Sequence, residues 1–279
     1  MNAETKRPST PRVRAVERAV AILSCFSPLA PRLTLTEISV RTGLDKVTVS
    51  RLLATLSACG LVRQEPATRA FVLTHRIVSL ASAVPGTVDL QELVEPVLRE
   101  VSRQTECLSF LSTPGPDGAI CLARAMIDPP IRVQLWKVGE SRPYNQGAAP
   151  RLLFAHLTET AREAVLARPL PQATPHTVAC AGRLRADAEG MQGQMHFIAR
   201  DDIVVGLSGA AHVIRDRDGG IMGAVSVSGL SPMFAGELGE QQIARLRAHC
   251  LELERQLAVS DIDWAGIRDD IWSMSAGMR

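Results

Sequence analysis

The segment 46–55 combines hydroxyl groups, positive charge and short side chains, which is the chemistry that reads base edges in the major groove of DNA. At about 100° per residue, its apolar and polar positions fall on opposite sides of a helix. The apolar stripe consists of Val49, Leu52, Leu53 and Leu56. The opposite side carries Lys46, Val47, Thr48, Ser50, Arg51 and Thr55. We expect the stripe to be buried and the polar side to face DNA.

Side-chain chemistry suggests individual roles on this surface. Arg51 can form a bidentate contact with guanine, and Lys46 can contact a phosphate. Arg69, in the turn of a following hairpin, and Arg12 or Arg14, near the amino terminus, suit the minor groove or the DNA backbone. Two alternatives stay open: Arg51 can be a solvated helix charge, and the same helix can serve a winged-helix module that binds another protein.

A second group of residues could bind a small molecule. The sequence YNQGAAPR, residues 144–151, precedes a helix that can begin at Pro150. Its small residues would leave backbone amides open to an anionic or polar ligand at the start of that helix. Alternatively, these small residues only allow strands and helices to pack closely.

Catalytic and metal-binding chemistry has little support in the sequence. The following histidines share no ligand spacing: His156, His176, His196 and His212. Ser208 and Ser226 have no base near them in sequence, and the pair Asp201 and Asp202 is typical of a solvated turn. We therefore predict no catalytic residue, no metal site and no cofactor. An enzymatic second half stays open as the alternative.

Hydrophobic runs and cysteine positions indicate the cellular compartment. No apolar run approaches the roughly 18 to 20 residues of a membrane span, and the first residues lack the apolar core of a secretory signal, so we expect a cytoplasmic protein without membrane contact. Six cysteines are scattered along it: Cys25, Cys59, Cys107, Cys121, Cys180 and Cys250. We expect mostly buried thiols, with a redox sensor as the alternative.

Length and charge both indicate two domains. The 279 residues, of which 46% are hydrophobic and 22% charged, suffice for two cores. Residues 1–80 contain 12 Lys or Arg against 5 Asp or Glu, whereas residues 81–279 contain 19 against 24. A basic first part and an acidic remainder fit one domain that approaches phosphates and another that does not.

Periodicity and turn residues predict the elements of both parts. Helices are expected at 14–26, 34–43 and 45–60, then a hairpin over 61–74 and a linker helix at 75–83. The second part mixes helices with antiparallel strands, including one at 131–138, and ends in a long helix at 240–259. The predicted domains are a flexible basic arm (1–12), a DNA-binding domain (13–75), a linker helix and hinge (76–89), an effector-binding and oligomerisation domain (90–261) and a tail (262–279) that is a packed helix or is loose.

These residues resemble the IclR family of bacterial transcriptional regulators over about residues 14–259. The segments RAVERAVAILSCF and LTLTEISVRTGLDKVTVSRLLATLSACGLVRQEP are similar to its winged helix-turn-helix, and VGESRPYNQGAAPRLLFAHL and GLSGAAHVIRDRDGGIMGAVSVSG are similar to its sensing domain. The resemblance implies an α+β fold, with a winged helix-turn-helix before a GAF- or profilin-like domain whose antiparallel sheet is flanked by helices. It also implies a repressor or activator that binds a double-stranded DNA operator as a homodimer or a dimer of dimers.

The resemblance further implies where an effector would bind. Carried over position by position, the pocket residues are Asn145, Gly147, Ala148, Ala149, Gly209, Ser226 and Ser228. Asn145 stands where a histidine is usual, Gly209 where many relatives have cysteine, and Ala199 where some have an acidic residue. Because the small residues free volume and remove charge, we expect an organic acid or an aromatic or apolar metabolite that is larger than a small oxo-acid. The alternative is that the small residues at 199 and 209 only let strands and helix pack.

Overall fold

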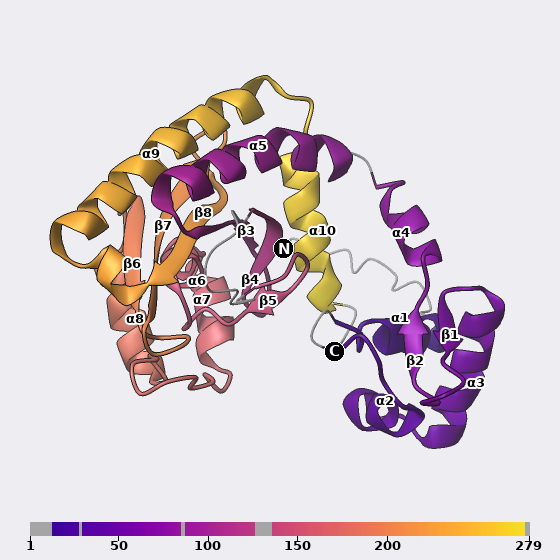
Figure 1. Ribbon diagram of the computed structural model, residues 1–279. Helices are drawn as coiled ribbons and strands as arrows, with labels where there is room; N and C mark the ends of the chain where they lie inside the picture. The colour runs from indigo at the N-terminus through magenta and orange to yellow at the C-terminus, as the bar shows by residue number, and fades with distance from the viewer. Residues whose placement is uncertain (1–12, 28–29, 85–86, 126–135, 277–279) are drawn as a thin grey trace, which may run out of the picture. The chain divides into compact units, whose positions relative to one another are not determined.

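The computed structural model describes residues 13–27, 30–84, 87–125 and 136–276 (Figure 1). Residues 13–84 form one compact unit, and residues 87–276 form a second. The predicted arm at 1–12, which includes Arg12, lies outside the described residues.

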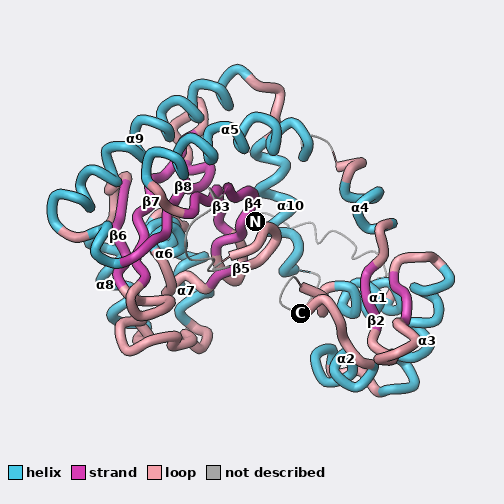
Figure 2. The backbone as a smooth tube through the Cα atoms, viewed as in Figure 1, coloured by secondary structure: helices cyan, strands magenta, loops and turns pink. Residues whose placement is uncertain are grey.

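The first unit packs α1, α2 and α3 with a two-stranded hairpin, which a fourth helix, α4, follows (Figure 2). Its elements are α1 (Arg14–Leu23), α2 (Leu35–Thr42), α3 (Lys46–Ala58), β1 (Val62–Gln64), β2 (Phe71–Leu73) and α4 (Arg76–Ala81). Its core is built from Ile22, Leu33, Ile38, Val49, Leu53, Leu56, Val62 and Phe71. The apolar stripe of α3 thus lies inside this core, with Leu52 partly buried beside it.

Local capping interactions fix the start of α2 and the turn between α2 and α3. Thr34 and Glu37 form a reciprocal capping box at the start of α2, and Gly43, with φ of +68°, ends that helix in the left-handed region. Asp45 begins α3: its carboxylate accepts hydrogen bonds from the backbone N–H of Thr48 at 2.9 Å and from the Thr48 hydroxyl at 2.7 Å. These bonds favour the ionised carboxylate and lower the pKa of Asp45.

Replacing Asp45 with alanine should lower the melting temperature of the protein at neutral pH, because the first turn of α3 loses its cap. The folded-state pKa of Asp45 lies below its unfolded value, so its stabilising effect is present above about pH 4 and is lost as the pH falls through the folded pKa. Melting curves from pH 7 downwards should therefore show the two proteins converging. The control Asp45→Asn, which keeps an acceptor, should melt close to the original chain at pH 7; a difference of constant size at every pH would contradict the prediction.

The second unit is built on one six-stranded antiparallel sheet, in the order β5-β4-β3-β8-β7-β6. The strands are β3 (Leu108–Pro114), β4 (Ala119–Ala125), β5 (Ser141–Arg142), β6 (His196–Arg200), β7 (Leu207–Arg215) and β8 (Ile221–Leu230). The helices are α5 (Thr87–Thr105), α6 (Ala148–Ala155), α7 (Glu159–Leu166), α8 (Ala181–Gly190), α9 (Gly236–Val259) and α10 (Trp264–Ala276), with a short 3-10 turn η1 (Ser231–Phe234). An α+β fold with a flanked antiparallel sheet is confirmed.

Helices cover both faces of this sheet, as Figure 1 shows for α5 and α9 on one side and α6 on the other. Because side chains alternate along a strand, one strand serves two cores. In β8, Val225 and Val227 point into the core under α5 and α9, whereas Ala224 belongs to the core under α6. Ser226 therefore faces the α6 side, where the candidate site lies.

The structure differs from the predicted strand at 131–138 in the part that it describes. Residues 136–138 turn instead: the Trp136 indole N–H donates to the Glu140 carbonyl at 2.9 Å, and the Lys137 N–H donates to the Glu140 carboxylate at 2.9 Å. Gly139, with φ of +80°, completes the turn, and its N–H donates to the Cys121 carbonyl at 2.8 Å. Strand β5 then covers only Ser141–Arg142, which pair with β4. The alternation of apolar residues at 131–138 was misleading, because these bonds to Glu140 turn the chain locally instead of continuing a strand.

The tail forms a helix that packs onto the second unit. Trp264 of α10 is buried, and its indole N–H donates to the Met222 carbonyl at 3.0 Å. Of the two alternatives for this segment, the packed helix is therefore found. No helix within the described ranges is long and apolar enough to cross a membrane.

Candidate functional site

The polar side of α3 is open to solvent. Val47 in its first turn is 70% exposed, and Lys46, Ser50, Arg51 and Thr55 are exposed as well. Thr48 is partly buried by its contact with the Asp45 cap. A helix with an anchored apolar stripe and an exposed first turn has the form required to enter a major groove.

Internal hydrogen bonds decide what each hydroxyl can offer to DNA. The Thr48 hydroxyl donates to Asp45, and the Thr55 hydroxyl donates to the Arg51 carbonyl at 3.1 Å. Since both protons are used within the helix, these threonines would act at a base edge as acceptors. Lys46 and Arg51 would supply the positive charge and the donors.

The hairpin presents a further cation. Arg69 adopts a positive φ of +57° at the turn, where its N–H donates to the Glu65 carbonyl and its carbonyl accepts from the Gln64 amide at 2.8 Å. The turn thus holds an exposed arginine at its tip. Arg14, the first residue of α1, is also exposed.

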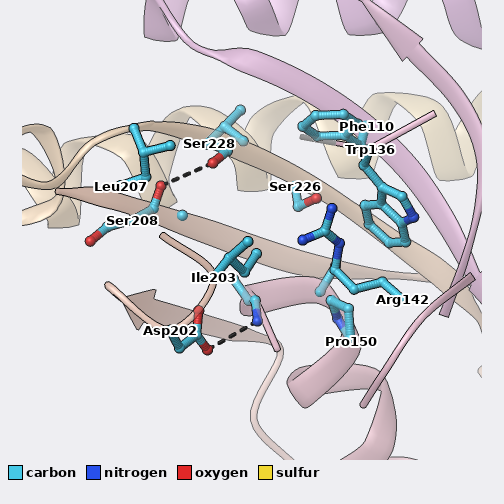
Figure 3. A pocket seen from close by; sticks show the side chains of 15 residues that line it. Phe110, Trp136, Arg142, Pro150, Asp202, Ile203, Leu207, Ser208, Ser226 and Ser228 are labelled. Carbon is cyan, nitrogen blue, oxygen red and sulfur yellow. Dashed lines mark hydrogen bonds between the residues drawn. The ribbon is translucent and has the colours of Figure 1, made fainter. Parts of the chain in front are cut away.

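A pocket opens on the α6 side of the sheet in the second unit (Figure 3). It contains about 470 Å³ of space, part of which is open to solvent. Strands β7 and β8, the start of α6, the loop before β7 and an aromatic pair provide its walls. The lining residues are Phe110, Trp136, Arg142, Gly147, Ala148, Ala149, Pro150, Asp202, Ile203, Leu207, Ser208, Gly209, Ser226, Val227 and Ser228.

Six of the seven residues predicted for the effector pocket line this cavity: Gly147, Ala148, Ala149, Gly209, Ser226 and Ser228. Asn145 is not among them. It is fully buried, and its amide donates to the carbonyls of Pro171 and Val178 at 2.9 and 3.0 Å. Asn145 therefore fastens the segment before α8 and does not line the pocket.

Asp202 is the largest departure from the sequence-based interpretation. It is not in a solvated turn but only 3% exposed, and its Oδ2 accepts a hydrogen bond from the Gly147 N–H at 3.0 Å (Figure 3). The Arg151 guanidinium lies 3.7 Å from the same oxygen. Burial raises the pKa of Asp202 against the opposing effects of these two partners. The amide of Gly147, expected to be open to a ligand, is thus already bonded.

Arg142 is the second pocket residue that the sequence did not reveal. Its side chain is only 8% exposed, its guanidinium lies 5.1 Å from the centre of the Trp136 ring, and burial lowers its pKa. Gly118 allows β5 to approach this closely, because a Cβ atom there would collide with the Arg142 carbonyl. No spacing rule could indicate this residue, since its neighbours come from distant segments.

The volume expected from the small residues at 199 and 209 is not found. Ala199 lies in the core under α6 and does not line the pocket. A Cβ atom at Gly209 would lie 2.7 Å from the Val227 carbonyl, so β8 has closed in on this glycine. At both positions the small residue allows neighbouring segments to pack closely, which is the alternative given above for Ala199 and Gly209.

The other candidate residues are histidines, serines, acidic residues and cysteines. Among the described residues, no group of three His, Cys, Asp or Glu side chains could hold a metal ion. The Ser208 hydroxyl lies 2.8 Å from that of Ser231, which donates to Asp201. Cys107, Cys121 and Cys250 are buried, whereas Cys59 and Cys180 are exposed and Cys25 is intermediate; burial raises the pKa of Cys107 and of Cys121 to about 12.

Comparisons with known proteins find one family domain in each unit. The IclR helix-turn-helix domain matches residues 15–66, and the C-terminal domain of the bacterial transcriptional regulator IclR matches residues 83–255. The transcriptional regulator XynR of Escherichia coli K12 is 26% identical over 223 residues, 79% of this chain and 88% of that protein. Such relatives are transcriptional regulators and not enzymes.

Solved structures show the same fold. An IclR transcriptional regulator of Silicibacter sp. aligns with a TM-score of 0.78 at 22% identity, covering 90% of this chain and 98% of that one. An IclR homologue of Microbacterium hydrocarbonoxydans, complexed with 4-hydroxybenzoate, aligns with a TM-score of 0.73 at 22% identity, covering 88% and 100%. Since the two matching domains account for most of both units, this chain belongs to the IclR family of bacterial transcriptional regulators.

Proposed function

We propose that this regulator, acting in the cytoplasm, reads its operator with the exposed side of α3 and changes its affinity for DNA when a small organic acid or apolar metabolite binds the pocket. The observation that carries the proposal is the pairing, in one chain, of an anchored helix with an exposed polar first turn and a separate pocket that holds buried charge. Arg51 specifies a guanine, and Lys46, Arg69 and Arg14 contact the backbone or the minor groove.

In this proposal, the other exposed residues of α3 contact the bases and phosphates next to the guanine that Arg51 binds. Ser50 and Thr55 can hydrogen-bond to base edges or phosphates, and Val47 can contact a thymine methyl group. Arg12 belongs to the same proposal, although it lies outside the described residues. Together these contacts would fix the register of α3 in the groove.

A homodimer is the smallest assembly that fits the proposal. Two recognition helices, one or more helical turns apart, are needed to read a palindromic site. The first unit supports this with unpaired apolar side chains on α1 and α4: Val16 is 60% exposed, Val20 51% and Val78 63%. Pairing of dimers through the second unit would give a dimer of dimers. The hinge would lie in the linker at 76–89.

The pocket is the sensor in this proposal. The effector lies against Gly147, Ala148 and Ala149 at the start of α6, near two hydroxyls of β8. The Ser228 hydroxyl donates to the Ser208 carbonyl at 3.2 Å and so meets a ligand as an acceptor, beside the Ser226 hydroxyl. The complex of a family relative with 4-hydroxybenzoate supports an aromatic acid as the ligand class. An effector that favours one of two domain arrangements alters operator affinity by its differential binding energy.

A footprint of the full chain on its own upstream region tests the proposal. We expect two protected half-sites about one or more helical turns apart, with protection that weakens between about 50 and 200 mM salt because phosphate contacts release counterions. Adding 4-hydroxybenzoate should shift the protein concentration needed for protection. Absence of protection at low salt would overturn the DNA-binding assignment to this region, and identical footprints with and without any of a series of organic acids would overturn the effector role.

A further inference from the structure

The pocket contains one buried cation and one buried anion. We infer that Asp202 selects the effector by excluding a second carboxylate and accepting a hydrogen bond, so that the ligand is a small apolar or aromatic monoacid that also carries a hydroxyl or ammonium group. The inference rests on the proposed effector role of the pocket. It adds a ligand class and a residue that determines it.

The first step concerns the start of α6. A helix amino terminus attracts anions through its free N–H groups and its dipole. Here a carboxylate of the protein already fills that position, since Asp202 Oδ2 accepts from the Gly147 N–H. Gly147 needs to be a glycine, because its φ is +85° and a Cβ atom would lie 2.9 Å from Ile203. An acidic effector therefore finds an anion where the helix alone would have bound it.

The second step concerns how firmly Asp202 is held. The Thr177 hydroxyl donates to the Asp202 carbonyl at 2.6 Å, which fixes the backbone at this residue. The side chain cannot leave without giving up a bond to a backbone N–H in a buried site. Asp202 is thus a permanent part of the pocket wall.

The third step concerns the groups around the Asp202 carboxylate. Four groups favour its ionised form against the effect of burial: the Gly147 N–H, Arg151, the backbone N–H of Asp202 itself and, at longer range, Arg142. Arg151 is shared, because its guanidinium lies 2.7 Å from Asp187 and 3.7 Å from Asp202. The Gly147 N–H and Arg151 both contact Oδ2, and a carboxylate has about four lone-pair sites, so it can accept a further hydrogen bond from a ligand. A hydroxyl or ammonium group can donate this bond.

The fourth step places the acid group of the effector. Arg142 is the cation among the lining residues, next to the Trp136 ring, and a guanidinium, with five N–H donors, can donate to a ligand carboxylate besides its contacts within the protein. Phe110, Trp136 and Ile203 supply apolar surface around these two charges. A ligand with a carboxylate at one end can bind Arg142, and a hydroxyl or ammonium group at its other end can donate to Asp202. A diacid would instead bring a second negative charge towards Asp202.

Calorimetry at pH 7 on the full chain tests the inference with three probes of similar size: benzoate, 4-hydroxybenzoate and terephthalate. We expect 4-hydroxybenzoate to bind at least about tenfold more tightly than terephthalate, because like charges repel in a buried site. Asp202→Asn keeps an acceptor for the Gly147 N–H but loses the charge, and should reduce this ratio to about threefold or less. The matched control Asp201→Asn removes a charge from the neighbouring residue, outside the pocket, and should keep the original ratio.

The outcomes distinguish the selection of the ligand by Asp202 from the effector role of the pocket itself. Tighter binding of terephthalate than of 4-hydroxybenzoate by the original chain, a comparison that needs no variant, would overturn the selection by Asp202. The same conclusion would follow if Asp202→Asn and Asp201→Asn gave equal ratios. If none of the three acids bound to any of the proteins, the effector role of the pocket for such acids would fall, and the selection with it.

Discussion

Replacing Leu53 with alanine should lower the free energy of unfolding of the first unit by about 2–5 kcal/mol, the cost of removing a buried leucine side chain and leaving a cavity. Leu53 is 1% exposed and belongs to the core that anchors α3. Denaturant unfolding of the full chain should show an earlier transition, and DNA binding should fall with it because α3 is no longer held.

The control for this substitution is Leu73→Ala in β2, where the side chain is 36% exposed. It removes the same atoms from a site that is open to water, so the change should be within about 1 kcal/mol. If both variants unfolded at the same denaturant concentration, α3 would not depend on its apolar stripe, and the buried stripe would lose its role as the anchor of the recognition helix.

Replacing Arg51 with alanine should weaken operator binding by about 1–3 kcal/mol, or roughly 5- to 150-fold, and relax the preference at one base pair. The reason is that a bidentate contact from an arginine to guanine is lost while the fold remains, since this side chain is exposed on α3. Titrations of the footprinted site, with each base pair changed in turn, measure both effects.

Two comparisons make the Arg51 result specific. Arg99→Ala removes an exposed arginine from α5, where it pairs with Glu95, and should leave operator affinity unchanged. Lys46→Ala should weaken binding to every sequence by a similar factor, as expected for a phosphate contact. Loss of affinity in Arg51→Ala without any change in base preference would reassign Arg51 to the DNA backbone.

Local interactions made the first unit predictable from the sequence. The apolar stripe of α3, the cap at Asp45 and the ending of α2 at Gly43 each depend on residues within a few positions of one another. Periodicity and capping rules describe such contacts directly. The hairpins β3–β4, β6–β7 and β7–β8 were predictable for a similar reason, because short turns join their strands. The pairing of β3 with β8, far along the chain, was not.

The pocket was only partly predictable, because its charges meet through the tertiary fold. Asp202 and Gly147 are 55 positions apart, and the pair of acidic residues at 201 and 202 has the composition of an exposed turn. Arg142 enters the site because β5 pairs with β4 beside Gly118. Asn145, conversely, follows the right loop but turns to bond Pro171 and Val178.

The alternation of β8 also bears on how such a regulator can diversify. Ser226 lines the cavity, whereas its neighbour Val225 belongs to the core under α5 and α9 and does not line the cavity. A substitution at the serine can therefore change the polarity of the cavity while Val225 keeps its place in the core. The surface of the cavity can thus diverge among family members without loss of the core that supports it.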